Sequence, residues 1–198
     1  SLPHPPLEAV FTVDEEVGLE GAFALDCSDL KGRKLVNLDS EEEGVFTVSC
    51  AGGVRVDCFL PGVKAPLNGE AGYEISLEGL LGGHSGAEIH KGRASANQVM
   101  GRVLYSAMER VPGLRLADIR GGKFDNVICS RNHAKAAVPA ERAGEFESFI
   151  QEFDAALKNE YAGCDDGVTL SCQKISLEGA LSPEATANML RTLLAVPQ

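Results

Sequence analysis

The strongest constraint on the fold is a change of hydrophobic period that recurs between residues 73 and 175. Short apolar runs typical of strands occupy 73–77, 114–120, 126–138 and 168–175. Between them, apolar residues recur at the helical spacing of three and four, first at Ala96, Val99, Met100, Val103 and Ala107, and then at Phe146, Phe149, Ile150, Phe153 and Leu157. This β-α-β-β-α-β order predicts a four-stranded antiparallel sheet with two helices on one face, the first helix beginning near Ser85.

Residues 1–52 follow a different pattern. Two short apolar runs, 7–13 and 34–39, flank a glycine-containing stretch with helical spacing, and this β-α-β order is typical of parallel strands. Both runs end in acidic residues, which are Asp14, Glu15 and Glu16 after the first and Asp39, Glu41, Glu42 and Glu43 after the second. The expected fold class is α/β plus α+β, with a partial parallel sheet in 1–52 and the antiparallel domain in 53–198.

The acidic composition of the chain argues against some classes of binding partner. The chain has a net charge of −11 at pH 7 and a pI of about 4.8, so its averaged field repels phosphate backbones and anionic lipids. Its apolar runs are shorter than the roughly 20 residues that span a bilayer. We therefore expect neither nucleic acid nor a membrane as a partner.

Six cysteines lie far apart in the chain without a C-x-x-C pair, and the chain begins without a basic and apolar leader. We interpret them as reduced thiols of a cytoplasmic protein rather than as a disulfide framework. The opening segment SLPHPPLEAVF runs from prolines straight into an apolar stretch, as a loop inside a protein does. This suggests an internal piece of a larger protein.

One short repeat is visible. The segment ISLEG occurs at 75–79 and again at 175–179, and each copy closes a predicted strand. After the second copy, Ser182 and Pro183 predict the N-cap and first turn of a helix. The repeat is either a coincidence of five residues or the start, at residue 175, of a second copy of the unit.

The acidic strand ends offer one kind of chemistry. Carboxylates from several strand ends can hold divalent metals, and a hydrolase also needs a carboxylate that takes a proton from water. Adjacent side chains such as Glu15 and Glu16 point in different directions and can divide these tasks. A solvated acidic turn is the alternative interpretation.

A second candidate site is the segment GGHSGAEIHKGRASAN, residues 82–97. With the helix beginning near Ser85, the His84 imidazole and free N–H groups would gather at a helix N-terminus, where an oxyanion or a carboxylate can be stabilised. Alternatively, His84 is an incidental loop histidine. His4, His90 and His133 are expected at the surface.

Five motifs in the same order resemble the zinc-dependent aminoacylase and carboxypeptidase metallopeptidase family, most closely its aminoacyl-histidine dipeptidase branch (peptidase D, bacterial carnosinase type). They are FTVDEEVGLEGA, NLDSEEEG, CAGG, YEISLEGLLGGHSGAEIHKGRASAN and GGKFDNVI, and the resemblance covers residues 7 to about 138. The resemblance implies that Glu15 is the general base, Glu16 and Asp39 are zinc ligands, His84 stabilises the tetrahedral intermediate, and Asn126 contacts substrate.

The match has gaps. The family's upstream His-x-Asp, its bridging aspartate and its last histidine ligand have no counterpart in this chain, so only two of the usual five ligands are present. Cys129 replaces a common proline, and Arg131, the candidate for the substrate carboxylate, is displaced by one position from the family's arginine.

The resemblance implies a fragment of a dizinc peptidase that hydrolyses Xaa-His dipeptides. Residues 1–52 would belong to the catalytic domain, 53–198 to a lid domain that forms a homodimer, and 175–198 to the start of a second lid unit. Another family activity, that of an aminotripeptidase or an N-acyl amino acid hydrolase, is the alternative. A further alternative is that the isolated chain is a non-catalytic lid and dimerisation module.

Overall fold

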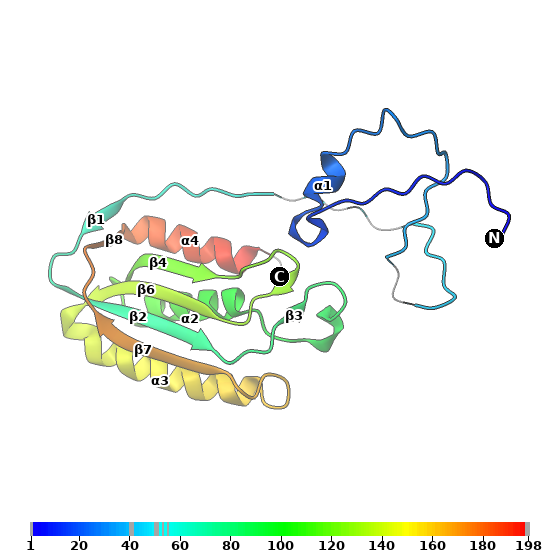
Figure 1. Cartoon of the computed structure of the whole chain (residues 1–198). Coiled ribbons are helices and arrows are strands. Elements are labelled where there is room, and N and C mark those ends of the chain that lie inside the picture. Colours follow the sequence, from blue (N-terminus) through cyan, green and yellow to red (C-terminus); the bar gives the residue numbers. More distant parts are fainter. Residues whose placement is uncertain (1, 40–41, 50–51, 53, 55, 197–198) are drawn as a thin grey trace. The chain divides into compact units, whose positions relative to one another are not determined.

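The computed structural model describes residues 2–39, 42–49, 52, 54 and 56–196 (Figure 1). The chain divides into two compact units, Ser1–Val56 and Asp57–Gln198. The predicted CAGG motif lies largely outside the described residues. Over the part of the chain that is described, no helix combines the length and apolar character needed to cross a membrane.

The second unit is built on the predicted four-stranded antiparallel sheet (Figure 1). Its spatial order is β4-β6-β2-β7, with the following bounds: β2 Glu70–Glu78, β4 Arg115–Gly121, β6 Asn132–Pro139 and β7 Thr169–Ile175. Strand β2 is central, because it pairs with β6 along one side and with β7 along the other. The predicted β-α-β-β-α-β order is confirmed.

Two long helices cover one face of this sheet, as predicted. They are α2, Ala96–Arg110, and α3, Ala143–Glu160, which follows a single 3-10 turn, η3, at Ala140–Arg142. From β2, Tyr73, Ile75 and Leu77 point into the core and are at most 1% exposed. The apolar positions predicted from periodicity are buried against them, with Phe153 partly buried. Burial of this apolar face stabilises the unit, at roughly 1.5–3 kcal/mol for each large side chain.

A third helix, α4 (Pro183–Ala195), joins the same core beside α2 and β4 (Figure 1). Ser182 is its N-cap, as predicted, and its side chain accepts a hydrogen bond from the Ala185 backbone N–H at 3.1 Å. Leu190 is fully buried. Thr186, also buried, accepts a hydrogen bond from the Leu116 backbone N–H at 3.0 Å. The predicted boundary after residue 52 and the second lid unit at 175–198 stay predictions.

Short elements connect these layers. Strand β1, Lys64–Pro66, pairs with β8, Gly179–Leu181, and a two-residue ribbon joins β3, Gly83–His84, to β5, Val127–Ile128. The strand predicted over 126–138 is therefore split into β5 and β6.

The prediction that the first helix begins near Ser85 is wrong. Helix α2 begins at Ala96, and residues 85–95 form a loop with one 3-10 turn, η2, at Ile89–Lys91. Gly92, with φ of +65°, closes that turn in the left-handed region and prevents a continuous helix.

The predicted parallel sheet is also absent from the described residues of the first unit. Its only regular elements there are a 3-10 turn, η1, at Glu15–Val17, and a short helix, α1, at Glu20–Phe23. Parallel strands are normally buried on both faces, whereas Phe11 and Leu35 are each 92% exposed. The two apolar runs lack the covering layers that would make them strands.

We expect Thr186→Val to destabilise the second unit by about 1–3 kcal/mol, because it leaves the buried Leu116 N–H without an acceptor. Urea unfolding of the chain measures this change. Thr192→Val, on the same helix, is the matched control: Thr192 donates to Asn188 O at an exposed site, so its loss should change stability by less than about 0.5 kcal/mol. Equal effects of the two variants would contradict the buried role of α4.

Candidate functional site

The loop between β2 and α2 carries His84 at its start. In the β3–β5 ribbon His84 lies opposite Val127, and the Ser85 N–H donates to the Asn126 carbonyl oxygen at 2.9 Å. The chain can turn here because Gly83 adopts φ of +133°, and a Cβ at that position would lie 2.5 Å from the Arg93 guanidinium. The structure thus brings together two of the predicted site residues, His84 and Asn126.

The His84 imidazole is oriented by its own loop. Its Nδ1 accepts hydrogen bonds from the backbone N–H groups of Gly86 and Ala87, each at 3.0 Å. A nitrogen that accepts two such bonds carries no proton, so the ring proton of the neutral imidazole lies on Nε2. The residue is exposed, and Nε2–H is therefore available to donate to a ligand.

Glu88 holds the loop closed behind this ring. Its Oε2 accepts a hydrogen bond from the His84 backbone N–H at 3.0 Å, and its Oε1 accepts one from Lys91. The Lys91 hydrogen bond, followed by the His84 N–H, lowers the pKa of Glu88 to about 2. Arg93 adds a hydrogen bond to the Gly82 carbonyl oxygen at 2.6 Å. Glu88 is thus ionised at neutral pH and links the ends of the turn.

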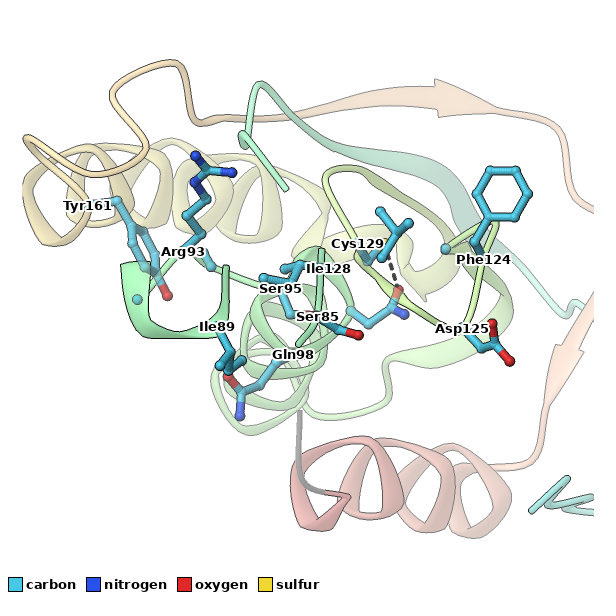
Figure 2. Close-up of a pocket in the computed structure, with 15 residues that line it drawn as sticks. Ser85, Ile89, Arg93, Ser95, Gln98, Phe124, Asp125, Ile128, Cys129 and Tyr161 are labelled. Carbon is cyan, nitrogen blue, oxygen red and sulfur yellow. Dashed lines mark hydrogen bonds between the residues drawn. The ribbon is translucent and has the colours of Figure 1, made fainter. Parts of the chain in front are cut away.

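A cavity of about 720 Å³ lies beside this loop (Figure 2). Its walls come from residues 85–98, the hairpin segment 122–129 and Tyr161. Figure 2 shows Arg93 and Tyr161 at one end and Phe124 and Asp125 at the other. The volume suits a small organic molecule or a short peptide. Its mixed polar and apolar lining offers both contact area and orienting groups.

Asn97, which motif reasoning left without a role, joins the two walls of this cavity. Its Oδ1 accepts hydrogen bonds from Asn132 Nδ2 at 2.8 Å and from the Cys129 thiol at 3.4 Å. Cys129 also contacts the Arg131 carbonyl oxygen at 3.1 Å, and its own carbonyl oxygen accepts the first N–H of α2. Sequence reasoning missed this link because its members are more than 30 residues apart. The thiol at the position of the family's proline is thus part of a structural contact.

Arg131 lies in the short connection between β5 and β6. Its side chain is exposed and lines a second, smaller hollow of about 400 Å³ together with Lys123 and His133. The structure places it on the same hairpin as Asn126. Its predicted contact with a substrate carboxylate stays a prediction.

The acidic residues belong to the first unit. Glu15 and Glu16 lie in η1 and are exposed, and left-handed backbone at Asp14, with φ of 57°, begins this turn. Neighbouring side chains in a 3-10 turn diverge by about 120° around its axis. Asp39 is exposed, and its backbone N–H donates to Asn37 Oδ1 at 3.2 Å.

The described residues alone do not form a site that could hold two zinc ions. Among them, no three His, Cys, Asp or Glu side chains gather in a way that could hold a metal ion. Two exposed carboxylates are fewer ligands than a tetrahedral site requires.

We expect nitrogen-detected NMR of the 198-residue chain at neutral pH to show His84 with an unprotonated Nδ1 and a protonated Nε2. The bonds from the Gly86 and Ala87 N–H groups to Nδ1 are the reason. His84→Asn, which removes the resonances, assigns them. A spectrum with the proton on Nδ1 would contradict the geometry described.

Three findings relate this chain to known proteins. Residues 75–164 match the family model of the peptidase dimerisation domain, M20. Over 197 residues, 98% of the chain, it is 36% identical to cytosol non-specific dipeptidase of Escherichia coli (strain K12), of which it covers 40%. The crystal structure of aminoacylhistidine dipeptidase from Vibrio alginolyticus aligns with 94% of this chain and 38% of that one, with 27% identity and a TM-score of 0.71.

The chain thus spans about two fifths of the length of these two relatives. Its resemblance to the metallopeptidase family is confirmed. Residues 75–164 match the M20 peptidase dimerisation domain, and almost the whole chain is similar to these two dipeptidases.

Proposed function

We propose that this chain is the dimerisation part, with a segment of the catalytic part, of a cytoplasmic dipeptidase. The observation that carries the proposal is the 36% identity to a cytosol non-specific dipeptidase over 98% of the chain. Peptide hydrolysis would belong to the longer enzyme, because the chain covers 40% of that relative. Its substrate would be a small peptide.

We propose Xaa-His dipeptides as the substrates. The motifs favour the histidine-dipeptidase branch, and the structural relative is named an aminoacylhistidine dipeptidase, while the curated relative is named non-specific. An aminotripeptidase or an N-acyl amino acid hydrolase is the alternative within the family. Comparing a His-terminated dipeptide, a tripeptide and an acyl amino acid as substrates of the full-length enzyme separates these activities.

The proposed role of His84 follows from its tautomer. As the scissile carbonyl is attacked, its oxygen gains negative charge, and an oriented N–H donor stabilises that charge more than it stabilises the ground state. Nε2–H is such a donor, since the bonds to Nδ1 fix the ring. Asn126, whose backbone is hydrogen-bonded to the same ribbon, would contact the bound peptide.

The roles of the acidic residues come from the motif. We propose Glu15 as the general base that takes the proton of the attacking water and returns it to the leaving amine. Glu16 and Asp39 are proposed as zinc ligands, with the other ligands supplied by parts of the enzyme that this chain does not contain. Divergent side chains in η1 support separate tasks for the two glutamates.

In the full-length enzyme we expect His84→Ala to lower kcat by about 10²–10³-fold, the usual effect of removing an oxyanion donor. Glu15→Gln should abolish turnover while metal content stays near that of the parent. His90→Ala, which changes an exposed histidine of the same loop, is the matched control and should retain full activity. Loss of bound metal in Glu15→Gln would make Glu15 a ligand instead.

A second candidate function is a non-catalytic dimerisation module formed by the isolated chain. Among the described strands, β7 is the outer strand next to β2 and pairs with no other strand, so its outer edge can pair with a second sheet. The match to a dimerisation domain favours this role.

We expect the isolated chain to have twice its 20.9 kDa monomer mass in light scattering at micromolar concentration. It should also lack dipeptidase activity and stoichiometric zinc. A 20.9 kDa species at every concentration would exclude the homodimer, and hydrolysis by the chain itself would exclude the non-catalytic role.

A further inference from the structure

The turn between α3 and β7, residues 161–168, contacts both ends of the loop that carries His84. Asp165 in this turn is fully buried. Its Oδ1 accepts a hydrogen bond from the Leu81 backbone N–H at 2.7 Å, and its Oδ2 accepts one from the Ala94 backbone N–H at 2.9 Å. Leu81 and Ala94 lie on either side of residues 82–93, so one carboxylate ties together the two ends of the His84 loop.

A second contact holds the turn against the loop independently of that carboxylate. Gly79 and Gly167 meet backbone to backbone, and a Cβ at Gly79 would lie 1.9 Å from the Gly167 carbonyl oxygen. Gly79 also has φ of +81°, a region that side chains disfavour. Cys164 adds a contact from its sulfur to the Gly92 carbonyl oxygen at 3.5 Å. The same turn therefore touches the loop near its start and near its end.

The chemistry at this position requires a carboxylate. A buried carboxylate is costly unless hydrogen bonds compensate for its lost hydration, and here each oxygen receives an N–H donor. An asparagine can accept through its carbonyl oxygen alone, and its NH₂ group would face the second N–H donor. Asp165→Asn thus removes one of the two ties with little change of shape.

We infer that Asp165 is a positioning residue, which fixes the separation of Leu81 and Ala94 and thereby the place of the His84 imidazole. This inference rests on the proposed role of His84 in peptide hydrolysis. Displacing a group that acts on the transition state by about 1 Å can cost up to about 100-fold in rate, even when the substituted residue is far from the chemistry. Asp165 would therefore act on turnover more than on substrate binding.

The two hydrogen bonds to the Asp165 carboxylate are tested first in the unaltered 198-residue chain. NMR couplings across hydrogen bonds should connect the Asp165 carboxylate carbon to the amide nitrogens of Leu81 and Ala94. This measurement depends on neither activity nor the folding of a variant. If neither coupling is seen while the backbone couplings between β2 and β6 are, the inference is overturned.

The consequence is tested in the full-length enzyme with Asp165→Asn. We expect kcat to fall by roughly 10–100-fold with KM changed by less than about 3-fold, together with faster exchange of the Leu81 or Ala94 amide. Asp166→Asn is the matched control: Asp166 accepts a bond from the Gly163 N–H in the same turn, makes no described contact with the loop, and should leave kcat unchanged.

The outcomes separate this inference from the proposed function. An active parent enzyme in which Asp165→Asn keeps its kcat, or loses it no more than Asp166→Asn does, would overturn the positioning role and leave the dipeptidase intact. A parent enzyme that hydrolyses no dipeptide would overturn the proposed function, while the couplings would still decide whether Asp165 ties the loop.

Discussion

The second unit depends on strand β2 being central and on its apolar face being buried against the helices. It pairs with β6 and β7 along its length, and Tyr73, Ile75 and Leu77 anchor it to the layer of helices. Alternate residues, such as Glu74, face away from that layer. Because a shift of one residue would exchange these faces, the register of β2 is strongly fixed. The chain therefore leaves the sheet at a defined point, Gly79, where the His84 loop begins.

Leu80 and Ala94 still pack in the core, but between them the loop is ordered mainly by hydrogen bonds. The His84 ring is held by two backbone N–H groups, Glu88 closes the turn behind it, and Asp165 joins the loop ends. Each of these acceptors is anionic or an aromatic nitrogen, and each bond is directional. An exposed imidazole thereby gains a defined direction without burial, which leaves its Nε2–H accessible.

Periodicity predicted the four-stranded sheet and the two helices that cover it, because their packing obeys a simple rule, with apolar residues on one face of each helix and strand. It failed at 85–95, where Gly92 closes a 3-10 turn and local hydrogen bonds replace the helix. The sequence pattern also carried no signal for Asp165, since its partners lie 84 and 71 residues away. A buried aspartate in a short turn reads in sequence like any surface acid. Motifs located His84 and Asn126, while the contacts that orient them needed the tertiary structure.

In the first unit, strand-like composition did not lead to strands in the described residues. The run at 7–13 has strand-like composition, yet Phe11 is almost fully exposed, because a parallel strand is stable only with neighbours and with helices on both faces. The acidic turn that follows this run is exposed as well. Exposed carboxylates such as Glu16 and Asp39 are well hydrated and hold a divalent ion weakly until further ligands and a surrounding shell remove competing water. A metal role for either residue therefore requires further ligands, whereas the donor at His84 is already oriented within the second unit.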